Sequence, residues 1–132
     1  MILDTEFLIS LEAGEETALE TAAELEAMDV PLRVPTVVVQ ELYVGVGAGS
    51  DSFANANKYE ALMANKPTVE LTGTIARQAG ALQGQHLVSD TKPNLGTGDA
   101  VVAATGLQYN EAVVTSDEDF THVEGLTVEL VS

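Results

Sequence analysis

The sequence predicts an α/β fold, a three-layer α/β/α sandwich with a short parallel central sheet. Short apolar runs alternate with stretches of helical periodicity, which is the pattern of β-α-β units around a parallel sheet. Hydrophobic residues make up 45% of the chain and aromatic residues only 5%, so aliphatic side chains must fill the core. A length of 132 residues suits one such core, and we expect a single domain over residues 1–132.

Five short apolar runs are expected to form the strands. They cover residues 1–3, 32–35, 67–71, 112–115 and 126–131. Pro67 opens the third run, where a proline is tolerated because the first residue of a strand need not donate to the ladder. The last run alternates in polarity, which is typical of an edge strand.

Helical periodicity fills the stretches between these runs. The expected helices cover residues 15–28, 36–45, 53–64, 74–87 and 99–107. In the first of them, Glu16 and Glu20 lie on the face opposite the apolar residues. Thr36 is a plausible N-cap for the second, and the glycines at 47 and 49 are expected to end it.

The charge balance is strongly acidic. Twenty-one Asp and Glu residues face five Lys and Arg residues, which gives a formal net charge of −16. Such an excess normally argues against nucleic-acid binding, which relies on basic residues to neutralise phosphates. In concentrated salt, however, the Debye length falls to about 3 Å at 1 M and a carboxylate-rich surface stays soluble. We therefore interpret the charge as adaptation to a salt-rich cytoplasm, such as that of a halophilic archaeon.

Other classes of protein are excluded by what the sequence lacks. It contains no cysteine, which rules out disulfides, zinc–cysteine sites and thiol nucleophiles. No stretch is long and apolar enough to span a membrane, and no basic segment precedes an apolar run at residue 1. We expect a cytoplasmic protein that does not bind membranes.

Four acidic residues occupy positions that an ordinary charged surface does not explain: Asp4, Glu41, Asp99 and Asp117. Asp4 follows the first expected strand directly and Asp117 follows the strand at 112–115, both at carboxyl ends, where an open α/β sheet has its binding crevice. Glu41 lies beside Val38 and Leu42 on the helical face that should meet the core, where an unpaired carboxylate is costly. The predicted topology directs all four towards one crevice.

Each of the four also has an ordinary structural interpretation. Asp4 suits a helix N-cap, and Asp99, or Thr97 before it, suits the cap of the helix that follows. Glu41 would be satisfied by a salt bridge to one of the five basic residues. Asp117 lies in a Ser-Asp-Glu-Asp stretch, which is typical of a polar turn.

Clustered carboxylates repel one another unless a cation joins them. Oxygen-only ligands favour a hard ion such as Mg²⁺ or Mn²⁺, and the absence of cysteine and of a well-placed histidine disfavours zinc. A magnesium ion held by few carboxylates keeps waters and neutralises charge on a phosphate. The chemistry that this combination indicates is phosphodiester hydrolysis.

At these residues the sequence resembles the PIN-domain family, and within it the VapC-type toxin ribonucleases of bacteria and archaea. The resemblance extends over residues 1–132 and rests on four segments: ILDT at 2–5, VQEL at 39–42, GDAVVAAT at 98–105 and VTSDEDF at 114–120. The last two are the most specific. The sequence departs from common members at Glu6, where a small residue is usual, and at Ser10, which is often acidic.

The resemblance implies a Mg²⁺-dependent endoribonuclease, with Mn²⁺ as an alternative ion, in which Asp4, Glu41, Asp99 and Asp117 are both catalytic residues and metal ligands. Thr5 and Thr115 would support them. It also implies an RNA substrate, a small antitoxin protein as partner, and a homodimer. Two other functions remain open: a catalytically silent PIN-like domain that binds RNA or protein, and a phosphoryl-transfer domain built around an aspartate. The second lacks a late lysine, because none follows Lys92.

Overall fold

The computed structural model describes residues 1–131, and its centre is a short sheet in which all strands are parallel. The strands are β1 (Ile2–Leu3), β2 (Val34–Pro35), β3 (Thr68–Val69), β4 (Val113–Thr115) and β5 (Val128–Leu130). They form one sheet of order β1-β4-β5 and one of order β2-β3. A parallel bridge between Ile2 and Arg33 joins the two, so the strands run β3-β2-β1-β4-β5 across the molecule.

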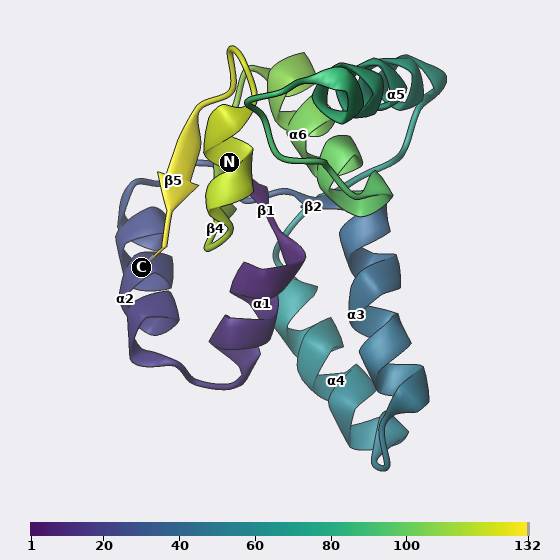
Figure 1. Cartoon of the computed structure of the whole chain (residues 1–132). Helices are drawn as coiled ribbons and strands as arrows, with labels where there is room; N and C mark the ends of the chain where they lie inside the picture. The colour runs from purple at the N-terminus through teal and green to yellow at the C-terminus, as the bar shows by residue number, and fades with distance from the viewer. Residues whose placement is uncertain (132) are drawn as a thin grey trace.

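Six α-helices and one 3₁₀ helix surround these strands within the described residues. They are α1 (Thr5–Glu12), α2 (Glu16–Ala27), α3 (Thr36–Ala48), α4 (Ser52–Met63), α5 (Gly73–Val88), α6 (Thr97–Tyr109) and η1 (Glu118–His122). Figure 1 shows α5 and α6 together on one side of the strands and α1 and α2 on the other, while α3 and α4 run side by side away from the sheet. The predicted three-layer α/β/α fold with a short parallel sheet is confirmed.

The core is aliphatic and centres on β1, β4 and α6. Strand residues such as Leu3 and Val114 have no exposed surface, and α6 is buried without interruption over residues 100–106. A helix that is apolar on all sides belongs in the interior. Because α6 is packed in the core, its first turn is held near Asp117, which follows β4, and near Glu41 of α3.

Several element boundaries differ from the prediction. Residues 5–12 form α1, which the periodicity did not predict because the segment is short and begins with the polar Thr5 and Glu6. Helix α3 continues through Gly45 and Gly47 to Ala48, and Thr36 is its first residue rather than its cap. Helix α6 begins two residues before Asp99. The strands predicted at 67–71 and 126–131 shorten to β3 and β5.

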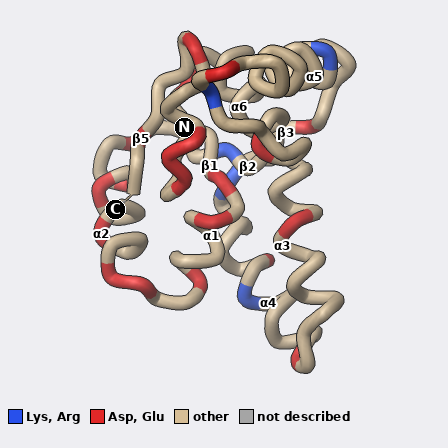
Figure 2. Tube along the Cα trace, viewed as in Figure 1, with Lys and Arg blue, Asp and Glu red and all other residues tan. Residues whose placement is uncertain are grey.

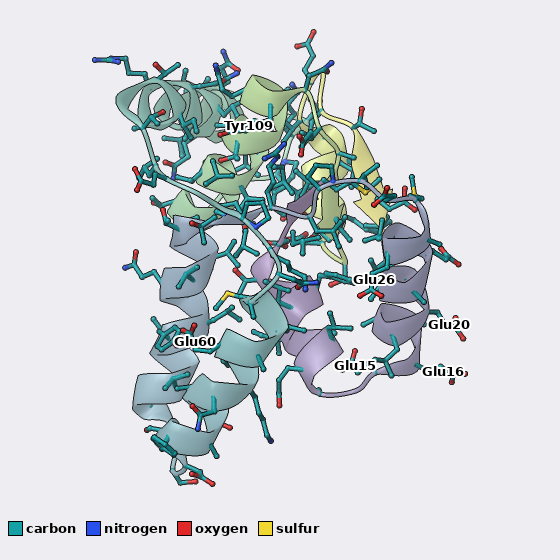
Figure 3. The ribbon with its side chains drawn as sticks, turned by 180° about the vertical axis from the view of Figure 1, so that it is seen from behind. Glu15, Glu16, Glu20, Glu26, Glu60 and Tyr109 are labelled. Atoms are coloured by element: carbon teal, nitrogen blue, oxygen red, sulfur yellow. The ribbon has the colours of Figure 1, made fainter. Side chains whose placement is uncertain are left out.

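The acidic residues are spread over the whole chain, whereas the basic ones are few (Figure 2). Glu16 and Glu20 of α2 are exposed and point away from the body of the molecule, as Figure 3 shows. These carboxylates are solvated, as their helical face predicted. Across residues 1–131, no helix combines the length and apolar character needed to cross a bilayer.

Candidate metal centre

Asp4 lies between β1 and α1 and is anchored through both carboxylate oxygens. Its Oδ2 accepts a hydrogen bond of 2.7 Å from the Thr115 hydroxyl at the end of β4, and its Oδ1 accepts one of 2.8 Å from the Thr5 backbone N–H. The second bond caps α1, so the capping interpretation of Asp4 is correct as far as Oδ1 is concerned. Only 3% of the residue is exposed. A side-chain hydrogen bond between residues 111 positions apart in sequence, at the ends of the paired strands β1 and β4, therefore holds this carboxylate in place.

Glu41 approaches the same place from α3. The Thr5 hydroxyl donates a hydrogen bond of 3.3 Å to Glu41 Oε1, so Thr5 contacts both acids. The expected burial of Glu41 was wrong, because its neighbours Val38 and Leu42 are buried while Glu41 itself is exposed. Successive residues of an α-helix are rotated by about 100°, so Glu41 lies at the edge of the face of α3 that packs on the core and not within it. The carboxylate nevertheless turns inward to the start of α6, where it lies against Gly98.

Asp99 is the third residue of α6 and is partly buried. No side chain caps this helix, so neither Asp99 nor Thr97 serves as the cap considered from the sequence. The pKa of Asp99 is raised to about 6, mainly because burial disfavours its charged form, and then because of the negative charges of Asp117 and Glu41. Asp119 and Glu6 raise the Asp99 pKa further.

Asp4 has a pKa of about 6 for a similar reason. Burial raises the pKa, the hydrogen bonds from Thr115 and Thr5 lower it in part, and the charges of Asp99 and Glu41 raise it again. Two carboxyls whose pKa values lie near neutrality in one crevice are typical of a functional site.

Asp117 follows β4 and joins the site through Thr115. The backbone N–H of Asp117 donates to the Thr115 hydroxyl oxygen at 3.0 Å, and that hydroxyl in turn donates to Asp4. Asp117 Oδ1 accepts a hydrogen bond of 2.9 Å from the Asp119 backbone N–H and so caps η1. The polar-turn interpretation of Asp117 is therefore correct for its Oδ1. The negative charge of Asp117 also raises the Asp99 pKa, so Asp117 belongs to the same acidic site.

None of the four acids forms an ion pair within residues 1–131. The basic groups that do form ion pairs are the N-terminal amine and Arg33, both with Glu111, and Lys58 with Glu12. The salt-bridge interpretation of Glu41 therefore finds no support in the described part of the chain. Negative charge gathers at this end of the sheet without a protein cation to balance it.

The residues present fit a hard divalent cation in their chemistry. Carboxylate and hydroxyl oxygens are the ligands that Mg²⁺ and Mn²⁺ prefer, and a cation would offset the repulsion that raises the Asp4 and Asp99 pKa values. As the side chains stand, no three His, Asp or Glu groups among residues 1–131 lie close enough together to hold an ion. Binding would therefore bring the carboxylates of the site closer together than they lie here.

Three contributors to the site were not predicted from the sequence. Glu6 was noted only as a departure from the usual small residue, and Asp119 entered only as part of the Ser-Asp-Glu-Asp stretch, yet both charges raise the Asp99 pKa. Gly98 contacts the Glu41 carboxylate, and the one sequence signal for it was its place directly before Asp99.

The fold and the site thus define an α/β protein with parallel strands and an acidic site, to which the start of α1, the middle of α3, the start of α6 and the segment after β4 each contribute one acid. The sequence matches the family model described as PIN domain over residues 1–126, and the chain belongs to the PIN domain family. No curated protein sequence matches it.

Solved structures show the same fold at low identity. VapBC2 from Rickettsia felis, bound to a DNA fragment from its promoter, is similar with a TM-score of 0.87 and 17% identity, covering 99% of this chain and 98% of that one. DNA-bound VapBC from Salmonella typhimurium has a TM-score of 0.83 and 16% identity, covering 99% and 97%. VapC20 from Mycobacterium tuberculosis, a sarcin-ricin loop cleaving toxin, has a TM-score of 0.67 and 19% identity, covering 91% and 92%.

Proposed function

We propose that this single-domain chain, residues 1–132, is a Mg²⁺-dependent endoribonuclease of the VapC type. The observation that carries the proposal is the pair Asp4 and Asp99. Both are buried or partly buried, both have pKa values of about 6, and neither forms an ion pair with a basic residue among residues 1–131. The similar toxins, one of which is described as cleaving the sarcin-ricin loop, support RNA as the substrate.

Asp4, Glu41, Asp99 and Asp117 would hold the cation, with Mn²⁺ able to replace Mg²⁺. Bound there, a divalent cation supplies Lewis-acid chemistry by lowering the pKa of a water and neutralising charge on a phosphate. The Thr115 hydroxyl keeps Asp4 Oδ2 fixed, and the Thr5 hydroxyl holds Glu41 near it. Raised pKa values let Asp4 or Asp99 hold a proton near neutral pH and release it as the site fills.

The partner we propose is a small antitoxin that inserts a basic side chain, preferably arginine, among the four acids. Two similar structures support an antitoxin as the partner, because one from Klebsiella pneumoniae is described as a toxin-antitoxin complex and one from Mycobacterium tuberculosis as a member of the VapBC family of toxin-antitoxin systems. An arginine would supply the positive charge that the four acids lack within residues 1–131, and its planar fork matches carboxylates. We further propose a cytoplasmic homodimer in a salt-adapted cell, in keeping with the net charge of −16.

A cleavage assay on a mixed RNA pool tests the proposed function. The purified chain should cut RNA in Mg²⁺ or Mn²⁺, stop when EDTA is added, and recover when the ion is restored in excess. RNA that binds without being cut, with or without the ion, would contradict the enzyme and favour a silent PIN domain. Cleavage that persists in EDTA would contradict the metal centre.

A further inference from the structure

Gly98 is the second residue of α6, and nothing in its backbone conformation calls for glycine. It lies in an ordinary helical turn with no positive φ, a state that every L-residue adopts and that glycine favours less than any residue except proline. A glycine at such a position needs a steric reason.

The steric reason is the Glu41 carboxylate. A Cβ at Gly98 would lie 2.7 Å from Glu41 Oε1, 3.1 Å from Cδ and 3.3 Å from Oε2, and these are the nearest atoms outside its own helix and neighbours. Gly80 and Gly84 of α5, by contrast, have no atom within 4 Å of such a Cβ. Because Gly98 has no side chain, the Glu41 carboxylate can lie where a larger residue would place its Cβ.

Two further features favour this position of the exposed Glu41 carboxylate. The first turn of α6 has no side-chain cap, so its backbone N–H groups present partial positive charge to the approaching carboxylate. The Thr5 hydroxyl donates to Glu41 Oε1 from the other side. The Glu41 carboxylate is consequently held between α1 and α6, against Gly98, the residue that precedes Asp99.

We propose that Gly98 is a positioning residue, which sets the distance of the Glu41 carboxylate from α6 and so its approach to Asp99 in the metal centre. The inference rests on the proposed function. The atoms that a Cβ would meet are the mobile end of a glutamate, so Gly98→Ala displaces Glu41 without disturbing the core. Gly106 differs, because a Cβ there would meet Leu126 and Val113 within the core.

The test compares Gly98→Ala with Gly80→Ala, a helical glycine whose added Cβ contacts nothing. Mn²⁺ binding is measured by the loss of the free-ion electron paramagnetic resonance signal, and thermal unfolding is followed in EDTA. Gly98→Ala should bind Mn²⁺ about 10- to 100-fold more weakly, as expected when a ligand loses its orientation, and should unfold at the same or a higher temperature. Gly80→Ala should bind Mn²⁺ as the unaltered chain does.

A second background separates positioning from a general effect on α6. In Glu41→Asp, whose shorter side chain clears the added Cβ, introducing Gly98→Ala should change Mn²⁺ affinity by less than about twofold, because the two residues act through one contact. An equal loss in both backgrounds, or no loss in the first, would overturn the inference.

A crystal structure of Gly98→Ala gives an independent answer, with Glu41 moved away from α6 if the inference holds and unmoved if it fails. An unaltered chain that neither binds Mn²⁺ nor cuts RNA would contradict the proposed function instead, and the crystal structure would still decide whether Gly98 seats Glu41.

Discussion

The Thr115 hydroxyl donates a 2.7 Å hydrogen bond to Asp4 Oδ2 and accepts one of 3.0 Å from the Asp117 backbone N–H. One side chain at the end of β4 thereby ties together two acids that lie at opposite ends of the chain. The bond to Asp4 is fully buried, so its loss would leave a carboxylate oxygen without a donor.

Replacing Thr115 with valine should destabilise the protein by about 1 to 3 kcal/mol near neutral pH, because valine matches the shape of threonine but removes the donor. The Thr115 bond lowers the Asp4 pKa, so its removal should raise that pKa further. The deficit should therefore shrink as Asp4 becomes protonated, which urea denaturation at about pH 7.5 and about pH 5 would measure. Thr115→Ser is the control, and a deficit equal at both pH values would contradict the role given to the bond.

The metal-free protein should become more stable as the pH falls from about 7 to about 5. Asp4 and Asp99 have pKa values of about 6 when folded, against 3.8 for a free aspartate, so the folded state binds more protons over this range. The raised pKa of the buried Asp4 corresponds to about 2 to 3 kcal/mol of stability lost at neutral pH, and the less buried Asp99 contributes less because solvent screens its charge. Thermal unfolding in EDTA and molar KCl, where other charges are screened, would show the slope.

The double variant Asp4→Asn with Asp99→Asn should flatten this pH profile, because the two groups that titrate are gone. Added Mg²⁺ should flatten it in the unaltered chain by stabilising the charged forms. A profile that keeps its slope in the double variant would place the titrating groups elsewhere.

Asp99→Asn should abolish RNA cleavage while leaving the metal-free stability unchanged or improved. The amide keeps the shape but removes a charge that is repelled by Asp117 and Glu41. Glu16→Gln is a matched control, since it removes one charge from an exposed position on α2. Single-turnover cleavage and urea denaturation measure the two effects, and a variant with full activity would remove Asp99 from the catalytic set.

RNA cleavage should strengthen from dilute buffer towards molar KCl at constant Mg²⁺. With five basic residues against twenty-one acidic ones, long-range electrostatics oppose RNA, and screening removes that repulsion while contacts within a few ångströms persist. Ordinary nucleic-acid binding weakens steeply with salt instead. A titration of cleavage rate against KCl, with circular dichroism at each point, distinguishes the two, and activity that falls steadily would reveal a basic surface that carries the RNA.

The sequence by itself determined the layered α/β fold and the places of three acids. Asp4 directly follows one apolar run, Asp117 comes two residues after another, and Asp99 opens an apolar helix. Local periodicity is therefore enough to assign these acids to the carboxyl ends of strands and to the start of α6. In a parallel sheet those ends meet at one edge. Strand and helix periods are local properties of the chain, which is why they can be read residue by residue.

Only the tertiary structure decided how Glu41 and Gly98 meet and what Thr5 does. The helical period placed Glu41 on the buried face. In the structure α3 packs beside α6 (Figure 1). Glu41 is exposed there, and its carboxylate lies against Gly98. Helix α1 was missed because eight residues carry too little periodicity, and its first turn is stabilised by the side chain of Asp4. The distance between two residues 57 positions apart depends on how whole helices pack, and no local pattern records that distance.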